Sequence, residues 1–187
     1  MKSICIYCGS NNGSQAAYTD AAREMGKALA ERGIRLVYGG GKVGMMGIVA
    51  DAVLEHGGAV TGVITKSLYE LETGKNELDD LRIVETMHER KAGMAELAEG
   101  FIALPGGFGT FEELFEAITW LQLGIHQNPV GILNVNGYYD DLLAFLRHAS
   151  AEGFIRPAHL NMLLVDDAPD ALLDQMAAFQ YQSIRKV

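Results

Sequence analysis

The sequence has few cysteines, few basic side chains and no long apolar run. Two cysteines cannot build a disulfide framework, and this low count fits a reducing cytoplasm. Only 15 Lys and Arg stand against 24 Asp and Glu, and the net charge of -9 disfavours nucleic acid and anionic membranes as partners. The apolar run after Lys2 is too short for a signal peptide, and no run reaches the roughly 18 apolar residues of a membrane span. We therefore expect a cytoplasmic protein in which any anionic small ligand is held by local positive charge and backbone N–H groups.

A metal or redox centre is also disfavoured. Cys5 and Cys8 have the C-x-x-C spacing, but they lie in a predicted strand, where positions three apart point to opposite faces. The sequence has no second cysteine pair to complete a zinc site. We expect no metal and no cofactor.

What the sequence does contain is a regular alternation of apolar and helical segments over 187 residues, the length of a single domain. Apolar, β-branched runs predict strands at 3–8, 34–38, 59–65, 81–85, 100–104, 129–133 and 162–165. Helical periodicity predicts helices at 15–32, 45–56, 88–98, 111–124, 138–152 and 168–181. Strands separated by single helices imply right-handed crossovers. The prediction is an α/β fold, one domain over residues 1–187, with a doubly wound parallel sheet of about seven strands and helices on both faces.

Ligands of such a sheet bind outside the carboxyl ends of the strands, and a glycine-rich loop follows three of the predicted strands. The first loop covers 8–14. It is either a plain turn with Ser14 as helix N-cap, or a ligand loop in which Ser10 and Asn12 donate to a phosphate or sugar. The stretch 66–80 is the longest irregular segment, and a loop of that length is more often functional than idle.

The second loop, 39–47, contains a formal G-x-G-x-x-G. A dinucleotide site would want an acidic residue at the end of the next strand, but that strand ends in Val63-Ile64-Thr65. A Walker A motif is excluded because Lys42 is followed by Val43. The remaining interpretation is general: glycines let the backbone approach a ligand, and the next helix offers N–H groups to an anion. Met45 and Met87 could line a pocket for a flat base.

The third loop, 104–113, again precedes a predicted helix. Thr110 and Glu113 match a capping box, in which Glu113 would merely cap the helix, but that leaves three glycines beside Pro105 unexplained. Two carboxylates in the first turn of a helix would have low pKa values. Glu113 would then be ionised at neutral pH, which suits a base, a nucleophile or a cation stabiliser.

Arg90 and Lys91 lie in the predicted first turn of the helix at 88–98, where positive charge has the wrong sign for the helix dipole. The pair is either a solvated face or the holder of an anion, since Arg offers a bidentate fork to phosphate.

Together, the motifs Gly39-Gly-Gly-Lys-Val-Gly-Met-Met-Gly47 and Pro105-Gly-Gly-Phe-Gly-Thr-Phe-Glu-Glu113 resemble those of the LOG ("Lonely guy") family. The similarity extends to Cys8-Gly-Ser10, Met87-His-Glu-Arg-Lys91, Ile118-Thr-Trp120, Gln122-Leu-Gly-Ile-His126 and Gly137-Tyr-Tyr139. The resemblance implies a Rossmann-like dimer that cleaves the N-glycosidic bond of an adenine-type nucleoside 5'-monophosphate, giving free base and ribose 5-phosphate. It implies Arg90 and Glu113 as catalytic residues. The substrate-binding residues would be Ser10, Gly40, Gly41, Gly44, Met45, Glu72, Met87, Lys91, Gly106, Gly107, Gly109 and Thr110.

The residues support this chemistry independently. Cleavage of an N-glycoside passes through a cation-like ribosyl group, which needs a nearby carboxylate and an anchor for the 5'-phosphate but no redox cofactor. The alternative is a non-catalytic carrier of a nucleotide or of molybdenum cofactor with the same fold. Glu113 discriminates between the two, since a carrier has no need of a carboxylate there.

A homodimer is expected from the helix at 111–124. Its apolar stripe would comprise Phe111, Leu114, Phe115, Ile118 and Leu121. Three further apolar residues lie off that stripe, namely Ala117, Trp120 and Leu123. Apolar residues on most of the circumference of this helix imply that a second surface covers it, either another copy of the chain or the helix at 168–181.

Overall fold

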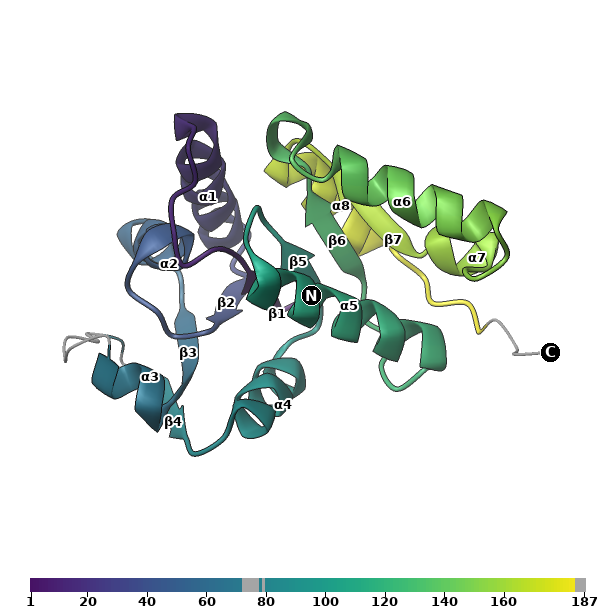
Figure 1. Ribbon diagram of the computed structural model, residues 1–187. Coiled ribbons are helices and arrows are strands. Elements are labelled where there is room, and N and C mark those ends of the chain that lie inside the picture. The colour runs from purple at the N-terminus through teal and green to yellow at the C-terminus, as the bar shows by residue number, and fades with distance from the viewer. Residues whose placement is uncertain (72–77, 79, 184–187) are drawn as a thin grey trace.

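The computed structural model describes residues 1–71, 78 and 80–183, and Figure 1 shows a parallel sheet with helices on both faces. The strands are β1 (Ser3–Tyr7), β2 (Arg35–Tyr38), β3 (Val60–Thr65), β4 (Leu81–Val84), β5 (Phe101–Ala103), β6 (Val130–Leu133) and β7 (Leu163–Asp166). The helices are α1 (Ala16–Glu31), α2 (Gly44–Glu55), α3 (Lys66–Leu71), α4 (Met87–Leu97), α5 (Phe108–Leu123), α6 (Asp140–Ala151), α7 (Pro157–Leu160) and α8 (Pro169–Ala178), with a 3-10 turn at Val135–Gly137.

The sheet has two hydrophobic layers, one on each face. Successive residues of β1 alternate between them: Ile4 and Ile6 pack with α1, α2 and α8, while Cys5 and Tyr7 pack with α4 and α5. Cys8 joins the first layer, so the two thiols lie on opposite faces of the sheet, as their spacing predicts.

The strand order is β4-β3-β2-β1-β5-β6-β7, with every pair parallel. The chain runs outward from β1 to β4, returns to the centre at β5 and runs outward again to β7. The order therefore reverses between β1 and β5, and ligands of doubly wound sheets bind in the crevice at such a switch point. The predicted fold class is confirmed, and the loops after β1, β2 and β5 converge on this crevice.

Some boundaries differ from the predictions. The stretch predicted as irregular at 66–80 begins with a short helix, α3, and residues 72–77 and 79 lie outside the described part of the chain. Ser14 is not the N-cap of α1: the cap is Gln15, in extended conformation and without a side-chain bond to the helix. α5 begins three residues before the predicted start, at Phe108. α8 ends at Ala178 because the backbone of Phe179 is extended.

Among the described residues, no helix combines the length and apolar character needed to cross a bilayer.

Candidate active site

The N-terminus of α5 lies at the switch point of the sheet. Gly107 is the N-cap and makes no side-chain bond, and the hydrogen bonds of the helix begin with Phe111 N–H donating to Gly107 O. The N–H groups of Phe108, Gly109 and Thr110 therefore have no carbonyl partner within the helix, which favours an anion at this end. Thr110 lies inside the helix, so the capping box of Thr110 with Glu113 does not form and does not account for Glu113.

The glycines of the third loop fall into two kinds. A side chain at Gly106 would collide with the Thr110 hydroxyl and would come within 2.8 Å of the backbone nitrogen of Gly9, so close packing requires glycine there. A side chain at Gly107 or Gly109 would meet no atom within 4 Å. Protein packing does not require glycine at these two positions, and both border open space above the unpaired N–H groups.

That space is a pocket of about 220 Å³ between the first loop, the third loop and α4. It is lined by Cys8, Gly9, Ser10, Met46, Arg90, Gly107, Phe108, Gly109, Thr110 and Glu113. The structure thus brings both predicted catalytic residues together with Ser10 and three residues of the third loop that were predicted to bind substrate. Met46 was missed. Its neighbour Met45, which was expected to line a pocket, is 1% exposed and packs in the core, and it lines the adjoining second pocket.

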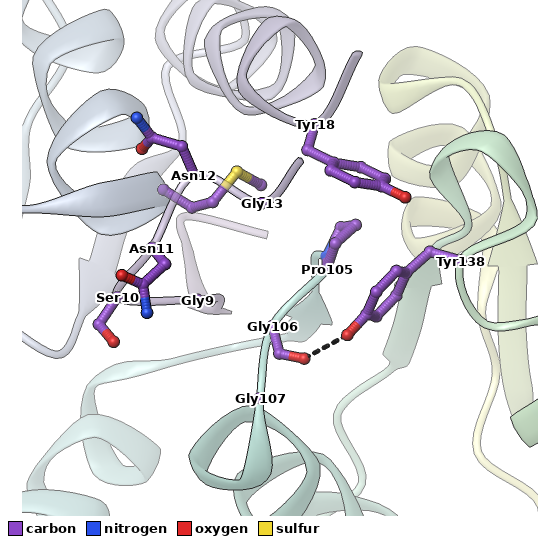
Figure 2. Close-up of a pocket in the computed structure, with 11 residues that line it drawn as sticks. Gly9, Ser10, Asn11, Asn12, Gly13, Tyr18, Pro105, Gly106, Gly107 and Tyr138 are labelled. Carbon is purple, nitrogen blue, oxygen red and sulfur yellow. Dashed lines mark hydrogen bonds between the residues drawn. The ribbon is translucent and has the colours of Figure 1, made fainter. Parts of the chain in front are cut away.

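A second pocket of about 190 Å³ adjoins the first and shares Gly9, Ser10 and Gly107 with it. Figure 2 shows Tyr18 and Tyr138 on one side of it, opposite Ser10 and Asn11. The Tyr138 hydroxyl donates to Gly106 O at 2.6 Å.

Tyr139 contributes a second anchor, since its buried hydroxyl donates to Leu104 O at 2.7 Å. Sequence reasoning assigned no role to this tyrosine pair. The available signal was its position, a few residues after β6 at the carboxyl edge of the sheet. The two tyrosines hold the third loop in place from the β6 side.

The second loop packs against its neighbours. Gly40 and Gly44 have positive φ angles of 73° and 65°, and a side chain at Gly44 would collide with the backbone of Ser10. Met45 N–H donates to Gly9 O at 3.1 Å, which ties the second loop to the first. Gly40, Gly41 and Gly44, all predicted to bind substrate, are not among the described residues that line the two pockets.

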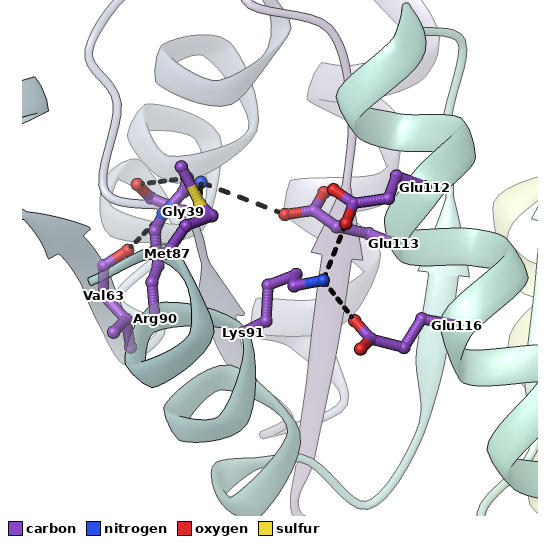
Figure 3. Close-up of polar contacts among 8 residues, drawn as sticks. All are labelled: Gly39, Val63, Met87, Arg90, Lys91, Glu112, Glu113 and Glu116. Carbon is purple, nitrogen blue, oxygen red and sulfur yellow. Dashed lines mark hydrogen bonds and ion pairs between the residues drawn. The ribbon is translucent and has the colours of Figure 1, made fainter.

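Arg90 is fixed by the main chain. Its Nε donates to Val63 O at 3.0 Å and its Nη2 donates to Gly39 O at 2.8 Å, so the ends of β2 and β3 hold the guanidinium (Figure 3). Nη1 lies 3.5 Å from the sulfur of Met87 and 4.0 Å from Glu113 Oε1. α4 itself begins with a capping box, in which Thr86 and Glu89 satisfy each other's backbone N–H groups. Arg90 therefore lies one turn into the helix, where the unfavourable dipole is weaker than expected.

Glu113 faces Arg90 from α5 and is 15% exposed. Burial raises the pKa of Glu113 from 4.5 to about 7, with the charge of Arg90 acting in the opposite direction. The prediction of a low pKa is wrong for two reasons. Glu113 lies in the second turn of α5, beyond the reach of the dipole, and α4 covers it from solvent. At neutral pH the carboxyl group is present in both forms, so it can accept a proton as well as donate one.

Lys91 points away from this pocket. Its Nζ donates to Glu112 Oε1 at 2.7 Å and lies 3.0 Å from Glu116 Oε2. Its side chain is 12% exposed, and the hydrogen bond to Glu112 raises its pKa. The sequence left open whether Lys91 holds an anion. In the structure its charge is paired with two carboxylates of the same chain.

The remaining predictions are placed as follows. Met87 is exposed and lies beside Arg90, at the edge of the site (Figure 3). Glu72 lies outside the described residues. In the part of the chain that the structure describes, no group of three or more His, Cys, Asp or Glu side chains could hold a metal ion.

The fold is shared with solved structures. The molybdenum cofactor binding protein of the bacterium Rippkaea orientalis superposes with a TM-score of 0.71 at 20% identity, over 95% of this chain and 97% of that one. The molybdenum cofactor carrier protein of Chlamydomonas reinhardtii gives a TM-score of 0.71 at 20% identity, over 94% and 97%. At this level of identity the likeness establishes the fold alone.

Sequence comparison is more specific. The family model described as "Possible lysine decarboxylase" matches residues 46–176. Cytokinin riboside 5'-monophosphate phosphoribohydrolase LOG of rice is 58% identical over 155 residues, which are 83% of this chain and 64% of the relative, so the match spans less than two thirds of that relative. The probable phosphoribohydrolase LOGL1 of rice is 51% identical over 94% of this chain and 79% of the relative, and LOG7 of Arabidopsis thaliana is 51% identical over 91% and 78%. The chain therefore belongs to the family of the LOG proteins.

Proposed function

We propose that the protein hydrolyses the N-glycosidic bond of adenine-type nucleoside 5'-monophosphates, cytokinin riboside 5'-monophosphate, AMP or both, to free base and ribose 5-phosphate. The names of the rice and Arabidopsis relatives support the substrate class. The observation that carries the proposal is the largely covered Glu113 facing Arg90 in a pocket that opens onto the N-terminus of α5.

The 5'-phosphate would bind above Gly107 and Gly109. Three backbone N–H groups without helical partners point there, and Ser10 adds a hydroxyl from the first loop. The absence of side chains at the two glycines lets the phosphate oxygens approach the backbone. This placement directs the ribose toward Glu113, which lies on the next turn of the same helix.

At the ribose, the bond between C1' and the base nitrogen breaks and its electron pair leaves with the base. The ionised Glu113 stabilises the positive charge that develops at C1' and accepts a proton from the water that attacks it. The protonated Glu113 releases that proton, which the departing base takes up, so the carboxylate is restored and substrate and water are converted to base and ribose 5-phosphate. No electrons are transferred to an acceptor, and the proposed reaction therefore needs no redox cofactor.

Arg90 supports this step by its position. Two backbone carbonyls fix the guanidinium and leave Nη1 facing Glu113. Its charge favours the ionised carboxylate, which the reaction requires, against the opposing effect of burial.

Lysine decarboxylation, which the description of the family model suggests, receives no support from the site. A pyridoxal phosphate enzyme needs a lysine that can become neutral and form a Schiff base. Lys91 is bound to two carboxylates with a raised pKa, and none of the described residues that line the pocket is a lysine.

The deciding experiment is to incubate the protein with AMP and with isopentenyladenosine monophosphate, without added metal or nicotinamide, and to measure free base by chromatography. We expect release of base from at least one of them. Glu113→Gln should lower kcat by roughly 100-fold or more while substrate affinity changes little. Glu55→Gln, an exposed carboxylate at the end of α2, is the matched control. Tight binding of the nucleotide without turnover would favour the carrier alternative.

We also propose a cytoplasmic homodimer in which α5 lies at the interface. The apolar residues Phe115 and Leu123 of α5 are 38% and 48% exposed in the single chain. The alternative cover, the segment 168–181, has less support: α8 packs on the other face of the sheet, and among the described residues from 168 onward Phe179 and Tyr181, beyond the end of α8, reach the layer of α5. The two free, buried thiols suit a reducing compartment.

A further inference from the structure

Lys91 follows Arg90 in the sequence but has a different environment. Arg90 lines the pocket at the N-terminus of α5, whereas Lys91 lines a small crevice between α4 and α5 together with Tyr7, Glu116 and Trp120. Glu113 lies between the two cations and lines both the pocket and the crevice. Its ammonium group lies between Glu112 and Glu116 (Figure 3). The two carboxylates that it binds flank Glu113 on α5, one residue before it and three residues after it.

The pairing is selective. Three carboxylates of α5 face two cations of α4, and each cation has a separate task. Arg90 approaches Glu113 alone, at 4.0 Å. Lys91 engages the two flanking carboxylates, at 2.7 and 3.0 Å, so their charges are balanced and Glu113 is left facing the pocket.

We propose that Lys91 is a positioning residue and not a ligand of the substrate: by binding Glu112 and Glu116 it joins α4 to α5 and keeps Glu113 opposite Arg90. The inference rests on the proposed function in one respect, namely that Glu113 is the carboxylate that acts at the ribose.

The electrostatic consequence follows from all the groups around Glu113. The charged ones are Arg90 and Lys91 on α4 and Glu112 and Glu116 on α5. β1 contributes Cys5 and Tyr7, and Cys8 follows directly after it. Burial raises the pKa values of all three, so they are neutral at the pH of the reaction. Removal of the Lys91 charge would leave Glu113 beside two unbalanced carboxylates, and like charges disfavour ionisation.

The test compares Lys91→Met, Lys91→Arg and the triple variant Lys91→Met/Glu112→Gln/Glu116→Gln. Lys27→Met, which removes an exposed ion pair with Glu31 on α1, is the matched control. NMR of carboxyl-labelled glutamate, assigned with Glu113→Gln, follows the titration of Glu113. Kinetics with AMP give kcat and KM as functions of pH.

We expect Lys91→Met to move the Glu113 titration upward by on the order of one pH unit. At pH 7 kcat should fall about fivefold through the lost ionised fraction, with KM changed less than about twofold. Lys91→Arg and the triple variant should bring the titration back toward that of the wild-type protein, and Lys27→Met should leave it unmoved.

With a folded Lys91→Met variant, either of two results would overturn the inference. One is a Lys91→Met variant whose KM for AMP rises tenfold or more with an unchanged Glu113 titration, which would make Lys91 a phosphate ligand. The other is a triple variant that does not restore the titration. If Lys91→Met does not fold, Glu112→Gln/Glu116→Gln replaces it, and the titration should then move downward; an unmoved titration contradicts the inference. The NMR measurement needs no turnover. If the wild-type protein hydrolyses nothing, the proposed function is wrong, but the titration of Glu113 still tests the role of Lys91.

Discussion

The carboxyl group of Glu113 shows how far a single residue depends on a distant part of the chain. Its sequence neighbours indicate a helix start and an ionised side chain, yet burial under α4, which ends 16 positions earlier, raises its pKa to about 7. Burial of this kind disfavours the charged form. The residue therefore reduces the stability of the folded protein whenever it is ionised.

The first prediction concerns this cost. The pKa of Glu113 is higher in the folded chain than its unfolded value of 4.5, so the folded state binds the proton more tightly between pH 4.5 and 7. Stability contributed by this group is complete below pH 4.5 and is lost as the pH rises through 7. Glu113→Gln mimics the protonated form and should be more stable than wild type by up to about 3 kcal/mol at pH 8, with little difference near pH 4.5.

Thermal unfolding of both proteins at several pH values measures the difference, with Glu55→Gln as the control. A stability difference that is the same at pH 5 and pH 8 would show that burial of the charge is not its cause.

At the scale of elements, the third loop and α5 separate the needs of folding from those of binding. Gly106 is required by packing, whereas Gly109 lies inside the helix with open space where a side chain would be. Glycine inside a helix costs stability relative to alanine because it is more flexible when unfolded. The presence of Gly109 is therefore explained by the ligand and not by the fold.

The second prediction is that Gly109→Ala and Gly106→Ala have opposite effects on stability. Gly109→Ala should raise the free energy of unfolding by about 0.5–1 kcal/mol and yet weaken binding of AMP, because the methyl group enters the pocket. Gly106→Ala should lower the free energy of unfolding by about 1–3 kcal/mol, because the added methyl group collides with Thr110 and Gly9. Denaturant unfolding and calorimetric titration with AMP measure the two quantities. Unchanged AMP affinity in Gly109→Ala would show that the substrate does not bind at this end of α5.

The third prediction concerns the same helix end. Adenosine lacks the phosphate that the N–H groups of α5 would bind, and two charge-assisted hydrogen bonds account for roughly 100-fold in kcat/KM. We expect adenosine to be hydrolysed at least that much more slowly than AMP. Equal rates on the two compounds would show that the third loop does not bind the 5'-phosphate.

Sequence reasoning reached the elements and the main site residues because their signals are local. Apolar runs predicted every strand of the sheet to within one or two residues. A glycine loop after a strand indicated the third loop, a charge pair at a helix start indicated Arg90, and the family motifs indicated Arg90 and Glu113 as the catalytic pair. The structure places both of these residues in one pocket. It failed where the signal is not local. The partners of Lys91 lie on another helix. The buried stripe of α5 runs through Ala117, with Phe115 exposed, because the sheet and the elements that pack on it decide which face of the helix is covered.

At the scale of the whole molecule, α5 links the pocket to an uncovered apolar surface. Its first turns carry the candidate site, and its last turns expose Leu123 beside Ile125, which is 63% exposed. Surfaces of this kind often mark protein contacts, and a two-fold contact between identical chains is the commonest form.

The fourth prediction is a dimer in solution. Sedimentation at micromolar concentration should give a species near twice the chain mass of 20.3 kDa. Leu123→Glu should produce monomer, because a charge in the contact would lose its water. Leu54→Glu is the matched control: Leu54 is 46% exposed on α2, on the opposite face of the sheet, and its replacement should leave the dimer intact. A wild-type species near 20.3 kDa contradicts the proposal.

The two carbonyl groups that hold Arg90 have a consequence for how the site tolerates genetic change. Both acceptors belong to the main chain, so replacement of Val63 by another apolar residue leaves its oxygen in place. Gly39 offers no such freedom, because any side chain there would occupy the position of the guanidinium. The orientation of Arg90 is thus insensitive to drift at one anchor and sensitive to every substitution at the other, so residue 39, outside the pocket lining, is restricted to glycine by the placement of Arg90 and not by the packing of the backbone.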